Sequence, residues 1–108
     1  MPLYVLLSTL TPTGRETLHK DPQRMKAVDK EVEKFGCKVI SQYALLGPYD
    51  FMTVVDAPDN ATLAHLVVDL GSRGTTNFIT LPALSIDEFA AKLSGPTHLA
   101  AMPEKSSS

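Results

Sequence analysis

The sequence predicts one α+β domain, in which helices cover one side of a four-stranded antiparallel sheet. Two observations favour this fold class. Strand-forming and helix-forming segments alternate in the order strand, helix, strand, strand, helix, strand, and a Gly-Pro turn joins the two consecutive strands. The length of 108 residues suits a single domain, and 44% hydrophobic with 20% charged residues is ordinary for a globular chain.

The first strand and the start of the first long helix are marked by local residue types. Leu3 to Leu7 is short and rich in strand formers, and we expect Thr11 to Gly14 to end that pattern as a loop. Asp21 and Pro22 then favour a helix start, because Asp caps free N–H groups and Pro suits the first helical position.

The first long helix is predicted to be amphipathic. Its apolar face repeats at steps of three and four residues, through Met25, Val28, Val32 and Phe35. The charged residues are expected on the opposite, solvated side: Lys26, Asp29, Lys30, Glu33 and Lys34. Gly36 is expected to end the helix in a left-handed conformation.

An antiparallel hairpin is predicted next. Cys37 to Leu46 forms one strand and Phe51 to Asp56 the other. In the turn between them, Gly47 permits a positive φ and Pro48 fixes its own φ, so that together they reverse the chain.

The second half repeats the pattern of a helix followed by a strand. Pro58 to Asn60 starts a helix that ends at Gly71, with an apolar stripe formed by Leu63, Leu66, Val67 and Leu70. Thr75 to Ala83 is the fourth strand.

A short last helix is expected from about Ile86 to Leu93. Ser85 with Glu88 forms a capping box that marks its start. The whole order is that of the ferredoxin-like βαββαβ fold with an extra C-terminal helix. We expect residues 1–93 to form the domain and residues 94–108 a small, polar tail.

Both faces of the predicted sheet look apolar. Alternation places Leu3, Val5 and Leu7 on one side and Tyr4 and Leu6 on the other. The third and fourth strands also carry apolar residues on both faces. Two helices can cover only one face of such a sheet. We therefore expect a homodimer that packs open sheet face against open sheet face, unless small residues or the last helix cover that face within one chain.

Charge and composition argue against several function classes. The net charge is −2 and no basic stripe is visible, so we expect no nucleic-acid partner. Apolar runs are far shorter than the ~20 residues that span a bilayer, so no membrane partner is expected. The single cysteine and the absence of a leader before the first strand fit the cytoplasm.

Tyr43, Tyr49 and Asp50 are the candidate ligand-binding residues. A structural role is the favoured interpretation for Tyr49 and Asp50, with the ring packed over the hairpin and the carboxylate accepting backbone N–H bonds. In the alternative, both groups border a ligand pocket. Tyr43 shares a strand face with Ser41, and would be the best polar group in the cavity of a dimer.

The other reactive residues favour structural interpretations. His65 and Asp69 lie one helical turn apart and are expected to be a solvated pair, and His19 is expected in a loop. The histidines lack metal-site spacing, so neither a metal nor a cofactor is expected. Cys37 is expected to be a small buried hydrophobe, and Arg73 to lie in a connector that could bind an anion.

The segment LLGPYDFMTVVDAPD resembles the GYD domain family, whose signature is Gly, a variable residue, Tyr and Asp. Three further segments agree in order: YVLLSTLTPTG, KDPQRMKAVDKEVEKFGCKV and DLGSRGTTNFITLPALSIDEF. The resemblance covers about residues 1–93 and implies a ferredoxin-like domain of the dimeric α/β-barrel type, in a bacterial or archaeal protein. It implies no particular activity. Thr75, Thr76 and Asn77 stand where the family usually has a longer charged pattern, which weakens the case for a charged site there.

The leading hypothesis is a non-enzymatic, oligomeric module for small-molecule binding or assembly. The alternative is a cofactor-independent monooxygenase or isomerase, which rests on analogy of fold alone. A third is a regulatory domain that senses a metabolite. Assemblies larger than a dimer are compatible with the tail packing on a neighbouring subunit.

Overall fold

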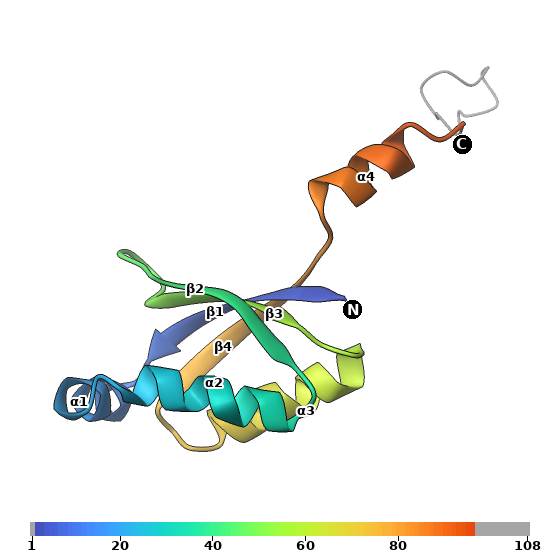
Figure 1. Cartoon of the computed structure of the whole chain (residues 1–108). Coiled ribbons are helices and arrows are strands. Elements are labelled where there is room, and N and C mark those ends of the chain that lie inside the picture. The colour runs from blue at the N-terminus through green and yellow to red at the C-terminus, as the bar shows by residue number, and fades with distance from the viewer. Residues whose placement is uncertain (1, 97–108) are drawn as a thin grey trace, which may run out of the picture.

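A computed structural model describes residues 2–96 of the chain (Figure 1). The predicted tail (94–108) and His98 therefore lie largely or wholly outside the described residues. The elements in order are β1 (Leu3–Leu10), α1 (Pro12–Lys20), α2 (Arg24–Lys34), β2 (Lys38–Ala44), β3 (Phe51–Asp56), α3 (Asn60–Gly71), β4 (Thr76–Ala83) and α4 (Ile86–Leu93).

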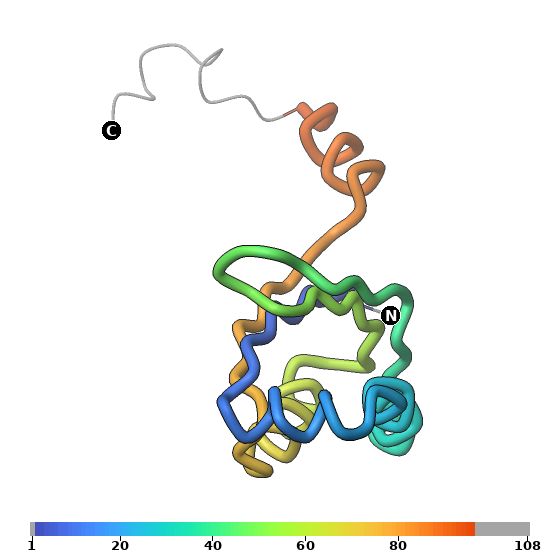
Figure 2. The backbone as a smooth tube through the Cα atoms, turned by 90° about the vertical axis from the view of Figure 1, so that its left-hand side faces the viewer, coloured from blue at the N-terminus to red at the C-terminus, as the bar shows by residue number. Residues whose placement is uncertain are grey.

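The four strands form one antiparallel sheet in the order β2-β3-β1-β4. This is the ferredoxin-like arrangement, and it confirms the predicted fold class. Helices α1, α2 and α3 lie on one side of the sheet (Figures 1 and 2). Within residues 2–96, no helix covers the opposite face of the sheet (Figure 2).

The core lies between the sheet and the helices. Its large apolar members come from β1, α2, β3 and α3, and they are Tyr4, Leu6, Val32, Val55, Leu63, Leu66 and Leu70. The Tyr4 hydroxyl donates a hydrogen bond to the side-chain oxygen of Asn60 at the start of α3. That hydroxyl thus meets a partner while its ring stays buried, which is the usual requirement for a core tyrosine.

Helix α1 was not expected from the sequence, and the predicted loop at Thr11 to Gly14 is wrong. Thr11 is the N-cap residue, since its Oγ1 accepts a hydrogen bond from the Gly14 N–H at 3.0 Å, and Pro12 occupies the first turn. His19 consequently lies in the last turn of a helix and not in a loop. Asp21 is the C-cap of α1 and precedes the start of α2 at Arg24.

Two glycines behave as the sequence predicts. Gly36, directly after α2, has a φ of 77°, and Gly47, in the β2–β3 hairpin, has a φ of 117°. Both values lie in the left-handed region that favours glycine. The hairpin is confirmed, although β2 is shorter than the predicted Cys37 to Leu46.

A β-bulge interrupts β2 at Ile40. Val39 pairs with Val55, but the next paired residue is Ser41, which lies opposite Val54. An extra residue in one strand shifts the alternation of side chains, so that each later side chain of that strand points to the opposite face of the sheet. Gln42 therefore faces the helices, together with Thr53, while Tyr43 faces the open side, together with Met52.

Helix α4 projects away from the rest of the domain (Figure 1). Its predicted capping box is confirmed, because Ser85 Oγ accepts from the Glu88 N–H at 3.0 Å and donates to Glu88 Oε1 at 3.3 Å. None of its residues is buried. The last helix therefore does not cover the open sheet face within its own chain, which was one of the two alternatives to a dimer.

Candidate functional site

A cavity of about 180 Å³ lies between α2 and the helix-facing side of the sheet. Its walls are mostly apolar and include Leu6, Val28 and Val32. Four strands, α1, α2 and the end of α3 all contribute lining residues, so the cavity is a feature of the whole domain. The sequence did not predict a cavity on this side.

Polar side chains form part of the cavity floor. Ser8 of β1 and Thr53 of β3 are both buried on the helix-facing side, where an apolar residue would be the default. Gln42 lies at the exposed β2 side of the cavity, with its Nε2 3.5 Å from Thr53 Oγ1. The β-bulge at Ile40 is what turns Gln42 toward this cavity.

Asp29 of α2 lines the same cavity on the side opposite the sheet. Its Oδ1 is buried and has no hydrogen-bond donor among the described residues. Burial raises the pKa of this carboxyl, Glu33 adds to the increase, and Lys26 opposes it. The prediction that Asp29 belongs to the solvated side of the helix is therefore wrong.

The sequence contained a signal for the position of Asp29. Asp29 follows Met25 by four residues and precedes Val32 by three, so helical periodicity alone places it on the apolar face. The prediction of a solvated position rested on the charge of Asp29, although its spacing places it on the apolar face.

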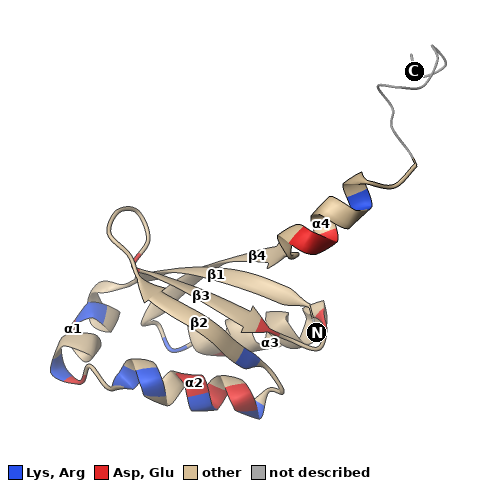
Figure 3. Cartoon of the chain, turned by 45° about the horizontal axis from the view of Figure 1, so that its top comes forward, with Lys and Arg blue, Asp and Glu red and all other residues tan. Residues whose placement is uncertain are grey.

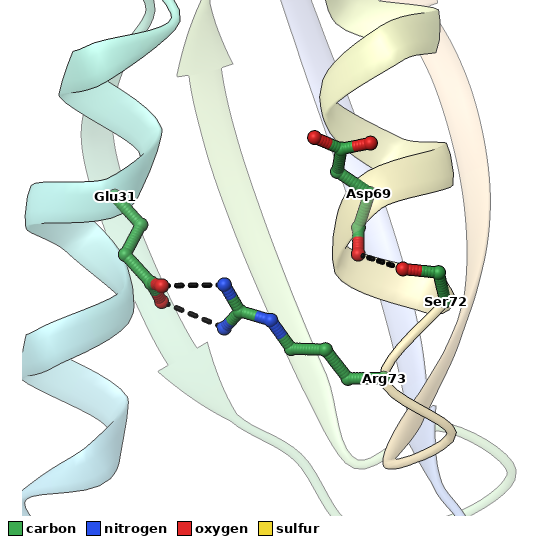
Figure 4. A network of polar contacts seen from close by, with 4 residues as sticks. All are labelled: Glu31, Asp69, Ser72 and Arg73. Atoms are coloured by element: carbon green, nitrogen blue, oxygen red, sulfur yellow. Dashed lines mark hydrogen bonds and ion pairs between the residues drawn. The ribbon is translucent and has the colours of Figure 1, made fainter.

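An ion pair joins α2 to the loop after α3 (Figure 4), and one of its members, Arg73, lines the cavity. Arg73, in the loop after α3, donates to both carboxylate oxygens of Glu31 on α2, with Nη1 2.8 Å from Oε1. This hydrogen bonding lowers the pKa of Glu31 and raises that of Arg73. Ser72 Oγ donates to the Asp69 carbonyl at 2.7 Å and steadies the same loop. The Arg73 guanidinium is thus engaged by a carboxylate of the chain itself.

The open sheet face is apolar, as the sequence predicted. Strand alternation and cross-strand register place on it Leu3, Val5, Leu7, Met52, Val54, Ile79 and Leu81. Ile79 and Leu81 are 46% and 44% exposed. Charged residues fall mainly on the helices, and the strands are largely uncharged (Figure 3).

A second apolar surface lies on α4. Ile86, Phe89 and Leu93 recur at steps of three and four, so they share one side of the helix, and they are 78%, 50% and 60% exposed. We call these three residues the α4 stripe. A helix held away from its own domain with its apolar side uncovered is typical of an association surface.

The three predicted site residues lie away from the cavity. Tyr43 is 54% exposed on the open sheet face, and Tyr49 is half-buried in the hairpin turn. Asp50 Oδ2 accepts from the Leu10 N–H at 2.7 Å, and its own backbone N–H donates to the Ser8 carbonyl at 2.8 Å. Asp50 thus bonds to β1 and not only within its own turn. A ligand-binding role for these residues stays a prediction.

The remaining candidates occupy structural environments. His65 Nε2 lies 3.6 Å from Asp69 Oδ2 on the exposed side of α3, and its ring meets Phe35 edge-on at 5.0 Å. Cys37 is buried, and burial followed by the nearby Asp59 raises its thiol pKa. Within residues 2–96, no group of three or more His, Cys, Asp or Glu side chains is placed to hold a metal ion. No helix in this part of the chain combines the length and apolar character needed to cross a bilayer.

These features define a small ferredoxin-like domain with a partly open cavity between helices and sheet, and with two exposed apolar surfaces. The chain belongs to the GYD domain family, which it matches over residues 4–93. It is similar to a Thermus thermophilus protein named "Glutamine synthetase and cystathionine beta-lyase binding protein". The two are 49% identical over 94 residues, which is 86% of this chain and 99% of the relative. No solved structure matches significantly.

Proposed function

We propose that this chain is a non-catalytic binding module that associates with a metabolic enzyme of the glutamine synthetase or cystathionine beta-lyase class. The observation that carries the proposal is the 49% identity to a relative named for binding these two enzymes, across 99% of that relative's length. Because the alignment spans 99% of the relative, we expect its binding surface to have a counterpart within this chain.

The α4 stripe is the proposed enzyme-binding surface. It presents three large apolar side chains on one helical turn after another, and their exposure supports a partner outside the domain. An amphipathic helix that lays its apolar side into a groove is a common mode of protein recognition. Asp87, Glu88 and Lys92 flank the stripe and would form the polar rim of such an interface.

The open sheet face is the proposed homodimer surface, in the dimeric α/β-barrel arrangement. Such a face offers roughly 500 Å² of apolar area per copy. Pairing two faces would bury roughly 1,000 Å², the lower limit for a specific interface. The near absence of charge on the strands supports self-association, because no like charges would oppose each other across the pair.

A dimer of this kind would enclose Tyr43 from each copy. We propose that any small molecule held between the two sheets meets the Tyr43 hydroxyl, with Tyr49 and Asp50 near the hairpin end. We also propose a cytoplasmic location, in keeping with the single buried thiol of Cys37.

Binding of purified glutamine synthetase and cystathionine beta-lyase from the same organism tests the proposed function. Biolayer interferometry should show saturable binding of at least one enzyme to the full chain. Phe89→Asp should weaken that binding by about tenfold or more, because a charge would be buried in an apolar contact. Ala91→Asp is the matched control, since it adds the same charge on the other side of α4. Equal loss in both variants, or no binding of either enzyme, would contradict the proposal.

Light scattering after size-exclusion chromatography tests the dimer separately. Wild-type protein should have twice the monomer mass, and Ile79→Asp on the open face should reduce that mass to a monomer. Val68→Asp is the control, because Val68 is 68% exposed on α3, away from this face. A monomeric wild-type protein would refute the dimer and leave the enzyme-binding proposal in place.

A further inference from the structure

The cavity beneath α2 is large enough for a small molecule and is partly open to solvent. A cavity of ~150 Å³ is known to hold a benzene-sized molecule. The volume here is about 180 Å³. It lies within one chain and does not depend on the dimer or on an enzyme partner.

The polar side chains of the cavity lie on neighbouring strands and face the same space. Ser8, Thr53 and Gln42 come from three adjacent strands in the order β1, β3, β2, and all three face the helices. Asp29 approaches from α2 on the opposite side. A mostly apolar pocket with a few convergent polar groups is the usual composition of a small-molecule site.

The carboxylate of Asp29 selects the chemistry of the occupant. Its Oδ1 is a buried acceptor without a donor in the described part of the chain. Buried acceptors of this kind are normally satisfied, and a charged donor gives the strongest bond to a carboxylate. The neighbouring cation Arg73 does not serve, because both of its terminal nitrogens are bonded to Glu31.

We propose that this cavity binds a small molecule that carries a primary amine on a compact apolar body. The ammonium group bonds to Asp29, and the body packs against Val28, Val32 and Leu6. Ser8 and Thr53 supply hydroxyls to a second polar substituent. The cavity volume suits a body of about the size of one aromatic ring.

An anionic ligand is the competing occupant, because Arg24 at the start of α2 also borders the cavity. The two are distinguished by three probes of similar size: benzylamine, benzyl alcohol and benzoate. They share the phenyl ring and carry a cationic, neutral or anionic head group, which is joined to the ring through a methylene group in the first two and directly in benzoate.

Titration of isotope-labelled full-length protein by NMR at neutral pH provides the test. Benzylamine should produce saturable shifts in residues of β1, β3 and α2 around the cavity, with affinity about tenfold above that of benzyl alcohol. Benzoate should bind more weakly than either. Tightest binding by benzoate, equal binding of all three, or shifts confined to the open sheet face would overturn the proposal.

Asp29→Asn supplies the residue-level test. It should remove the preference for benzylamine over benzyl alcohol, an effect of about tenfold, because a neutral amide cannot pair with an ammonium. Glu33→Gln is the matched control, since it removes the same charge one turn further along α2 from a residue outside the cavity lining. Loss of the preference in both variants would indicate a general charge effect and contradict the site. Circular dichroism of each variant checks that the fold is retained.

Discussion

Asp50 and Leu10 join the β2–β3 hairpin to the far end of β1, through a bond of 2.7 Å from the Leu10 N–H to Asp50 Oδ2. Backbone bonds of Asp50 to Ser8 and Leu45 reinforce the same junction. The aspartate of the signature thus fastens two segments that lie 40 residues apart in the chain.

Asp50→Ala should lower the free energy of unfolding by about 1–2 kcal/mol, because the Leu10 N–H loses a charged acceptor in a partly buried position. Asp50→Asn keeps an acceptor oxygen and should lose less. Urea denaturation measures both variants. An Asn variant that unfolds as easily as the Ala variant would show that charge, and not the hydrogen bond, dominates.

Gly14→Ala should destabilise the fold by about 1–3 kcal/mol, since overpacking forces the backbone to shift. A Cβ at position 14 would lie 2.0 Å from the carbonyl oxygen of Thr75, which itself accepts from the Thr11 N–H at 3.0 Å. Neither group can move without breaking the contact between α1 and the α3–β4 loop. Thermal unfolding provides the measurement.

Gly71→Ala is the control for that experiment. It lies in α3, and the nearest atom to an added Cβ is 3.9 Å away. Helix propensity should make this substitution neutral or stabilising by up to about 1 kcal/mol. A comparable loss at both glycines would point to a general intolerance of side chains and not to the close approach at Thr75.

Glu31→Gln should reduce stability at neutral pH by about 0.5–1 kcal/mol, because the pair with Arg73 is partly exposed to solvent. The pKa of Glu31 is lowered in the folded state, so its stabilisation is present above the ordinary glutamate pKa. It is lost as the pH falls through the lowered value. Urea denaturation at several pH values should therefore show wild type and variant converging in acid.

Asp29→Asn should change the stability at neutral pH in the opposite direction to Glu31→Gln. Burial raises the pKa of Asp29, so the folded state takes up a proton more readily than the unfolded chain, and stability falls as the pH rises from the unfolded to the folded pKa. In the absence of ligand, the variant should be more stable than wild type at neutral pH by at most about 1 kcal/mol, since it removes a charge whose Oδ1 is buried without a donor while solvent screens the rest of the carboxylate. The difference should vanish in acid, and a variant that is less stable at neutral pH would contradict this account.

The order of the elements was predictable because turn and capping residues mark most of the element boundaries in the sequence. Gly36, Gly47 and the Ser85–Glu88 capping box act over a few residues, and each is found where the sequence places it. Helix α1 was missed because Pro12 to Lys20 has no apolar stripe, although Thr11 and Pro12 form a good helix start.

The cavity was not predictable by the same means, because it depends on contacts between distant segments. The bulge at Ile40 has no residue signature, yet it decides that Gln42 and not Tyr43 faces the helices. Asp29 carried a periodic signal that its charge obscured. The capping residues of α4 predict that it is a helix, but they do not predict where the helix lies relative to the sheet.

The projection of α4 has a consequence for stoichiometry. If two copies pair through their sheets, the pair displays two such helices at once, and a multisubunit target can be held by both. Simultaneous attachment multiplies avidity without strengthening either contact, provided that the spacing of the two arms matches the spacing of the target's grooves. Where the spacing does not match, each pair would instead crosslink separate target molecules.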